Sequence, residues 1–235
     1  MQEPPSFIQI WSAILGATFA TLAVAVAAEP YRPAIDPANF THVVTNPFVA
    51  LTPGTTAIYQ EKDLRETREC KVEVLRTTRN VLGVKCVVVK EIVTLDGVLL
   101  EETYDWFAQD RQGAVWYFGE QTQEFKIGGR VSTFGSWEAG VRGAQPGILM
   151  PAQPKVGDRF RQEYLANEAE DIGQIVALGE TVAVPFGTFQ RCVRTREWSM
   201  LESGTTKKWY AHGVGFVRSE STGGEVSVLI SITRK

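Results

Sequence analysis

The chain has 235 residues, of which 44% are hydrophobic and 22% charged, and its formal net charge is −3. This composition excludes a disordered or collagen-like chain. The small net charge gives no electrostatic reason to expect nucleic acid or an anionic membrane surface as a partner. The length suffices for one core of sandwich or barrel size.

Residues 1–28 have the pattern of a signal peptide. Phe7–Ala28 is apolar apart from Gln9 and scattered Ser and Thr. The run ends in Val26-Ala27-Ala28, which predicts cleavage after Ala28. An uncleaved membrane anchor is the alternative, because Met1–Ser6 has no Lys or Arg and about 20 apolar residues can span a bilayer. Both interpretations place the rest of the chain in the periplasm or outside the cell, with membrane contact only through an uncleaved segment.

Residues 29–53 hold five prolines and little periodicity, which predicts an extended segment. Residues 54–235 are expected to form one antiparallel β domain, because short segments rich in branched and aromatic residues recur between turn signals. Ala166–Ile172 is expected to form a short helical turn. The expected strands are Thr55–Glu61, Cys70–Thr78, Val81–Leu95, Val98–Ala108, Ala114–Glu120, Asp158–Tyr164, Ile175–Val184, Cys192–Trp198, Thr205–Ala211, Phe216–Ser221 and Val226–Thr233. The fold class is therefore all-β, a half-barrel or barrel-like sheet.

Two predicted turns give a register for three strands. A two-residue turn at Asp96-Gly97 pairs Leu95 with Val98, and the connection at residues 109–113 pairs Ala108 with Ala114. Because directly opposed residues share a face, one face is expected to carry aromatic side chains with three glutamates at its edge. The aromatic residues are Tyr104, Trp106, Trp116 and Phe118, and the glutamates are Glu91, Glu102 and Glu120.

The row of Glu91, Glu102 and Glu120 has two interpretations. Like charges placed opposite one another destabilise a sheet unless a cation, a basic side chain or a shared proton compensates. The row could thus bind Ca²⁺ or supply an acid and a base. The other interpretation, which we favour, is a solvated rim with its charges pointing into water. A second acidic run, Glu163, Glu168, Glu170 and Asp171, is expected to be a solvated loop.

The remaining candidates are few. Trp137 lies among glycines and is either a ligand platform or a lid over the core. Cys70, Cys86 and Cys192 are expected to be buried structural thiols, with Cys70 and Cys86 on opposite faces and therefore not bridged. The sequence has no GxSxG, HExxH, P-loop or Rossmann motif, so no cofactor is expected.

Two C-terminal segments resemble known hairpins. Val184–Phe189 followed by Cys192-Val193, and Lys208–Val217, are similar to hairpins of exported bacterial half-barrel proteins, the TapB and DUF3108-like proteins, which are distantly similar to the LolA/LolB carriers. The resemblance covers the C-terminal third and implies a curved antiparallel sheet around an apolar hollow. Other segments are similar to an uncharacterised secreted bacterial family, which implies no activity: Asp105–Asp110, Val115–Glu120, Gly135–Gly140 and Gly143–Gly147.

The sequence therefore predicts an exported, non-enzymatic binding protein. Its ligand is expected to be a small apolar or glycan-like molecule in an aromatic-lined hollow formed by Tyr104, Trp106, Trp116, Phe118 and Trp137. Two alternatives stay open. One is a glycan-acting hydrolase that uses two carboxylates of the glutamate row, and the other is a structural envelope protein with a filled core.

Overall fold

The computed structural model describes residues 31–126 and 128–235, so the expected signal segment, residues 1–28, lies outside the described residues. The first strands are β1 (Phe40–Thr41), β2 (Thr55–Lys62), β3 (Thr67–Val81), β4 (Val84–Leu95), β5 (Val98–Asp110), β6 (Val115–Lys126), β7 (Arg130–Ser132) and β8 (Trp137–Glu138). The others are β9 (Gln145–Met150), β10 (Arg159–Arg161), β11 (Glu163–Tyr164), β12 (Asp171–Val184), β13 (Gly187–Ser199), β14 (Thr206–Ala211), β15 (Gly215–Ser221) and β16 (Val226–Arg234).

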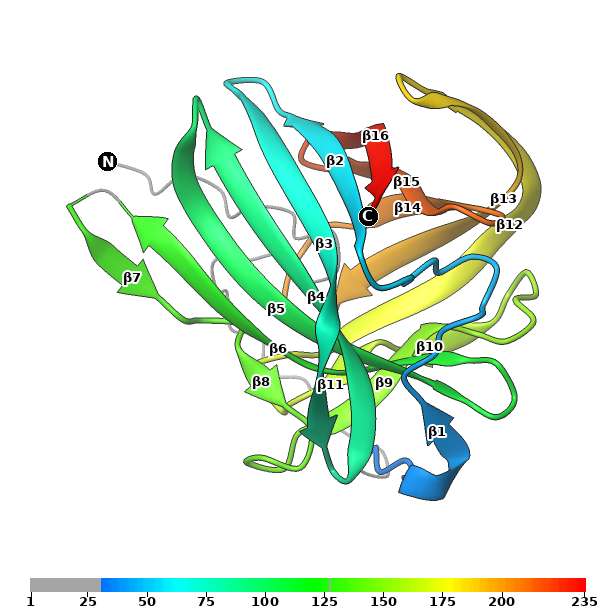
Figure 1. The fold of residues 1–235 in the computed structure, drawn as a ribbon. Helices are drawn as coiled ribbons and strands as arrows, with labels where there is room; N and C mark the ends of the chain where they lie inside the picture. Colours follow the sequence, from blue (N-terminus) through cyan, green and yellow to red (C-terminus); the bar gives the residue numbers. More distant parts are fainter. Residues whose placement is uncertain (1–30, 127) are drawn as a thin grey trace.

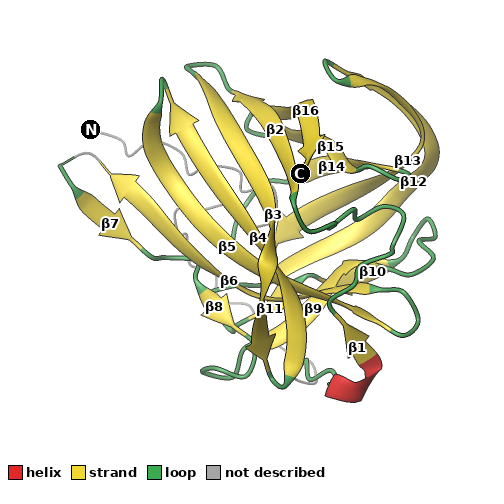
Figure 2. Ribbon diagram, viewed as in Figure 1, coloured by secondary structure: helices red, strands yellow, loops and turns green. Residues whose placement is uncertain are grey.

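The predicted all-β fold is confirmed. The strands form one antiparallel sheet in the order β10-β12-β13-β14-β15-β16-β2-β3-β4-β5-β6-β9-β11, with β1, β7 and β8 paired to its side. Strands β2–β6 form one curved wall, and the long β12–β13 hairpin curls on the other side (Figure 1). A short 3-10 helix, Pro37–Asn39, precedes β1 and stands out in Figure 2. Among the described residues, no helix is long and apolar enough to cross a membrane.

The two ends of the sheet meet in one short segment. Arg159–Arg161 pairs with β12, whereas Glu163 and Tyr164 pair with Pro146 and Gln145 of β9. The backbone N–H of Gln162, between these two ladders, donates to the carbonyl of Asp171. Residues 159–164 therefore nearly close the sheet into a barrel, and we call them the closing segment.

Alternation of side chains along the strands gives the barrel an inner and an outer face. The carboxyl of Asp105 on β5 interacts electrostatically with Lys208 on β14, although these strands are not neighbours in the sheet. Asp105 and Lys208 therefore face each other across the interior. The inner face also carries apolar groups, including the stacked rings of Phe107 and Tyr117, whose centroids lie 4.8 Å apart.

The register of β4, β5 and β6 differs from the predicted one. Leu95 does pair with Val98 as expected, but Val93 pairs with Glu101, so Leu100 is an extra residue on β5. The β5–β6 pairing starts two residues away from the predicted one, with Ala108 opposite Trp116 instead of Ala114, and Phe118 is a second extra residue. Each such bulge shifts the register by one residue and so moves the following side chains to the other face relative to their expected partners.

Of two smaller expectations, one is wrong and one is confirmed. The helical turn expected at Ala166–Ile172 is wrong: residues 165–169 form a tight turn closed by a bridge between Leu165 and Ala169, and β12 starts at Asp171. The three cysteines are buried free thiols, as predicted. Cys70 lies opposite Tyr59 and Cys86 opposite Arg79 in the sheet.

Candidate functional site

A pocket of about 290 Å³ opens beside β8. Strand β6 changes its partner along its length, from β9 at residues 115–117 to β8 at residues 119–120 and to β7 at residues 124–126. The wall is interrupted where these partners change. The pocket is lined by Arg79, Trp106, Glu120, Gln121, Ser136, Trp137, Glu138, Val141, Arg142 and Leu165. It is the site that we call the β6–β8 pocket.

The outer part of the pocket combines an aromatic ring with an ion pair. The guanidinium of Arg79 lies 4.0 Å from the centroid of the Trp106 ring. The same guanidinium bonds the carboxylate of Glu138 at 2.5 Å. Arg142, at the rim, bonds the exposed carboxylate of Glu168 with both terminal nitrogens, at 2.9 and 2.8 Å. The pocket therefore offers cationic donors, carboxylate acceptors and an aromatic surface within a small volume.

The inner part of the pocket contains Trp137 and Glu120, which lie opposite each other in the β6–β8 ladder. Trp137 packs edge-on against Tyr117, with ring centroids 5.2 Å apart. Its buried indole N–H faces the carboxyl of Glu163 and lowers the pKa of that carboxyl, against the larger and opposite effect of burial. Gly119 makes this arrangement feasible: its φ is +136°, and a Cβ atom there would collide with the backbone of Trp137 and Glu138.

The structure divides the predicted aromatic set. Trp106 and Trp137 line the pocket, but Tyr104, Trp116 and Phe118 do not. Trp116 and Phe118 both pack edge-on against Phe40 of β1, at 5.9 and 5.4 Å, and the Trp116 indole donates to Asp110 at 2.9 Å. The segment that contains β1 therefore covers Trp116 and Phe118 on the outer face.

The expected row of Glu91, Glu102 and Glu120 does not exist, so the predicted calcium site and acid/base pair at these three residues are wrong. Glu91 lies opposite Thr103, Glu102 opposite Ile92, and Glu120 opposite Asp105. Glu91 and Glu120 are buried, whereas Glu102 is on the outer face and forms an ion pair with Lys90 at 2.5 Å. The bulge at Leu100 separates Glu102 from Glu91, and the different β5–β6 pairing with its bulge at Phe118 separates Glu102 from Glu120.

Buried carboxylates instead gather inside the barrel. In the described part of the chain, eight acidic residues are buried against two basic ones, Arg68 and Lys208. Lys208 bonds Glu197 at 2.8 Å, and Glu197 also accepts from Thr195 and Tyr210. The buried acids are Glu61, Glu91, Glu101, Asp105, Glu120, Glu163, Glu197 and Glu225.

Burial changes the acidity of this interior. Burial raises the pKa of Asp105 to about 7, against a bond donated by the Tyr117 hydroxyl at 2.6 Å, and the charge of Glu101 raises it further. Burial also raises the pKa of Asp171, to about 6. Burial and the neighbouring Asp171 raise the pKa of Glu163 well above its usual range. These carboxyl groups therefore hold protons at pH values where carboxyl groups in water are ionised.

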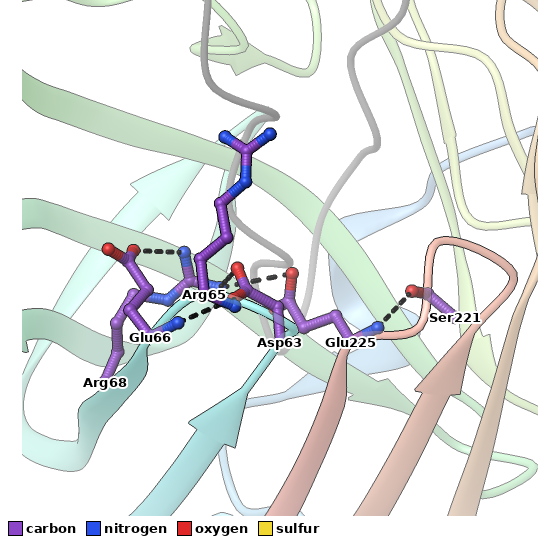
Figure 3. A network of polar contacts seen from close by, with 6 residues as sticks. All are labelled: Asp63, Arg65, Glu66, Arg68, Ser221 and Glu225. Carbon is purple, nitrogen blue, oxygen red and sulfur yellow. Dashed lines mark hydrogen bonds and ion pairs between the residues drawn. The ribbon is translucent and has the colours of Figure 1, made fainter.

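Arg68 anchors one end of the interior. Its guanidinium contacts Glu66 at 3.1 Å, Glu225 at 3.2 Å and Asp63 at 3.8 Å. Figure 3 shows this network joining the β2–β3 turn to the β15–β16 turn, where the backbone of Glu225 donates to Ser221. The Arg68 network therefore links the β2–β3 hairpin to the β15–β16 hairpin, which lie far apart in the chain.

Sequence reasoning missed most of the interior acids. Glu163, Glu170 and Asp171 belong to the run expected to be a solvated loop, yet Glu163 is buried, Glu170 and Asp171 are half-buried, and only Glu168 of that run is exposed. The signal that could have found Glu163 is its position in the expected strand 158–164, where alternation puts every second side chain inside.

No protein-family model and no curated protein matches the chain. Two solved structures are similar to it. One, from Bacteroides fragilis, is described as an exported protein with a YmcC-like fold; it has 18% identity and a TM-score of 0.48, over 80% of this chain and 99% of the other. The second, described as a lipoprotein from Parabacteroides distasonis, has 13% identity and a TM-score of 0.44, over 79% and 98%. The resemblance to the TapB and DUF3108-like proteins is not confirmed by these matches and stays a prediction.

Proposed function

We propose that the protein is an exported, non-enzymatic binding protein whose β6–β8 pocket binds a small glycan-like ligand. The observation that carries the proposal is the meeting of Trp106, Trp137 and Glu120 with the Arg79–Glu138 ion pair in one pocket of about 290 Å³. This volume is at the lower end of the range for ligand pockets, so it suits a small ligand.

The chemistry of the pocket favours a glycan-like ligand over an apolar one. An apolar ligand would remove water from Arg79, Glu138 and Arg142 without replacing its hydrogen bonds, which is unfavourable. A sugar ring presents hydroxyl groups that donate to carboxylates and accept from guanidinium groups, and such charge-assisted bonds are strong. Its C–H face can pack on an aromatic ring.

The export part of the proposal is supported by the sequence of residues 1–28, which has the apolar run and the small residues of a signal peptide. A hydrolase that uses Glu91, Glu102 and Glu120 is not proposed, because Glu102 lies on the opposite face from Glu91 and Glu120. If no probe binds, the remaining interpretation is a structural protein of the cell envelope.

Binding is tested by NMR titration of the full chain with N-acetylglucosamine and its β-1,4-linked dimer, with decanoate as the apolar probe. The indole resonances of Trp106 and Trp137 are expected to shift in a saturable way with a sugar probe, while that of Trp198, outside the pocket, stays fixed. Saturable binding of decanoate, or no saturable shift with either sugar, would overturn the proposal.

The matched pair of variants is Arg79→Met and Arg159→Met. Arg159 also lies over a tryptophan, 4.9 Å from the centroid of Trp198, but it does not line the pocket. Arg79→Met is expected to weaken sugar binding by about tenfold or more, because a hydrogen bond to a charged group is lost. Arg159→Met is expected to leave it unchanged, and an equal effect of both variants would exclude the pocket as the binding site.

A further inference from the structure

Three potential metal ligands converge on the inner face, away from the β6–β8 pocket. They are Glu61 on β2, Cys70 on β3 and Glu91 on β4, three consecutive strands of the sheet. One ligand atom from each lies within 4.8 Å of the other two. All three side chains are fully buried or nearly so, with 0%, 0% and 1% of their surface exposed.

A second observation points to a missing ligand at this position. Both carboxylate oxygens of Glu61 are buried and have no hydrogen-bond partner among the described residues. Leaving a buried carboxylate without such a partner is costly.

Arg68 does not bond Glu61, although the two residues are opposite each other in the β2–β3 ladder. Its guanidinium is directed to Asp63, Glu66 and Glu225, as the close-up shows (Figure 3). The positive charge nearest to Glu61 is thus engaged by other carboxylates. A cation at Glu61 would supply the neutralisation that this network does not give.

The donor set selects the class of metal. Ca²⁺ and Mg²⁺ prefer oxygen ligands alone, whereas a thiolate favours zinc-like divalent ions. Neighbouring ligand atoms of a tetrahedral zinc site lie about 3.3–3.8 Å apart, given bond lengths of about 2.0–2.3 Å. Atoms already within 4.8 Å reach this spacing through small side-chain rotations.

A water molecule would supply the fourth ligand of a tetrahedral site. The charge of Glu101 acts on Glu61 and Cys70, but its carboxylate is not among the ligand atoms that lie within 4.8 Å of one another. Glu101 instead accepts a hydrogen bond from the Thr103 hydroxyl at 3.0 Å.

We propose that Glu61, Cys70 and Glu91 form a binding site for one zinc-like divalent metal ion inside the barrel. Binding requires the Cys70 thiol and the carboxyl groups to be deprotonated, and the released protons pass to the solvent. The site does not depend on the β6–β8 pocket and goes beyond the proposed ligand binding.

The test uses the reduced, chelator-treated full chain titrated with Co²⁺, which reports thiolate ligation through a charge-transfer band in the near ultraviolet. The full chain is expected to bind one equivalent with this band. Cys70→Ser is expected to abolish the band, and Glu61→Gln to weaken Co²⁺ binding by about tenfold or more.

The matched controls are Cys86→Ser and Cys192→Ser, which change buried thiols outside the cluster. Both are expected to retain the band. Circular dichroism checks that each variant is folded, and Glu61→Gln keeps the test decisive should Cys70→Ser fail to fold. Absence of a band in the full chain, or a band that survives Cys70→Ser, would refute the site, while the sugar titration would be unaffected.

Discussion

At the scale of single residues, the buried carboxyl groups are the unusual feature of this protein. Asp105 is fully enclosed between the Tyr117 hydroxyl and the charges of Glu101 and Lys208. A carboxyl whose pKa is higher in the folded than in the unfolded state takes up a proton on folding. The interior carboxyls therefore couple the stability of the fold to pH.

The direction of this coupling is fixed by the pKa of Asp105, which rises from 3.8 in the unfolded chain to about 7 in the fold. The folded state binds more protons between these values, so the free energy of unfolding should decrease as the pH rises from about 4 to about 7. Asp171, with a pKa of about 6, acts in the same direction. When the free energy of unfolding is measured with urea at pH 5 and at pH 8, it should be lower by about 2–4 kcal/mol at pH 8.

Asp105→Asn keeps an oxygen that accepts from Tyr117 but cannot ionise, so this variant should lose a large part of that pH dependence. Asp96→Asn, in the exposed β4–β5 turn, is the control and should behave like the unaltered protein. An Asp105→Asn variant with the full pH dependence would show that other groups store the protons.

At the scale of elements, the segment before β2 stabilises the outer face. Phe40 of β1 contacts both Trp116 and Phe118. Further along the same segment, the Asn46 amide donates to the carbonyls of Gly113 and Pro151, at 2.9 and 3.1 Å. This segment is thereby tied to the β5–β6 hairpin and to the end of β9.

Phe40→Ala should lower the free energy of unfolding by about 2 kcal/mol, because a half-buried ring and two edge-on aromatic contacts are lost. Val43→Ala, a 57% exposed position three residues later, should change it by less than about 0.5 kcal/mol. Urea unfolding of both variants decides this; equal losses would mean that Phe40 contributes no specific packing.

The sequence predicts most of the strands and turns correctly, but it does not predict the β-bulges. The Asp96-Gly97 turn was predicted correctly because its residues specify it, and most of the expected strands match observed ones. Nothing in Leu100 or Phe118 marks either residue as an extra one, since a bulge depends on what the neighbouring strand and loop require. Of the predicted aromatic residues, Trp106 and Trp137 line the β6–β8 pocket, and their binding role stays a prediction, while the glutamate row was wrong.

The interior acids were hidden for a different reason. In an open sheet, alternating polar residues indicate a solvated face. In this nearly closed sheet, the polar residues Glu101, Thr103 and Asp105 face inward, and the outer face carries Trp106. Which face is inner is decided by closure, which needs the pairing of distant segments.

At the scale of the whole molecule, closure depends on the close approach of β9 to the closing segment. Gly147 has no room for a side chain, since a Cβ atom there would overlap the carbonyl groups of Arg161 and Gln162. The φ of Gly147 is not in the left-handed region, so glycine is required at this position only because there is no space for a side chain.

Gly147→Ala should therefore separate β9 from the closing segment. Hydrogen exchange of residues 145–150 and 159–164 should become faster, while the β12–β13 hairpin keeps its protection. Gly223→Ala is the matched control, because Gly223 also lacks a left-handed φ and its Cβ would only contact the Ser221 hydroxyl at 3.5 Å. Unchanged exchange in Gly147→Ala would show that the joint tolerates a wider spacing.

The position of β16 has a consequence for how the protein is made. This strand pairs with β2 over Val226–Arg234 and with β15 on its other side, so it lies in the middle of the sheet although it is synthesised last of the strands. A growing chain can form β2–β6 and β12–β15 from local hairpins, and the closing segment can join them on one side of the barrel. The other side, where β16 lies between β15 and β2, cannot form until β16 has emerged, so the nascent protein must remain open there until its last strand is made.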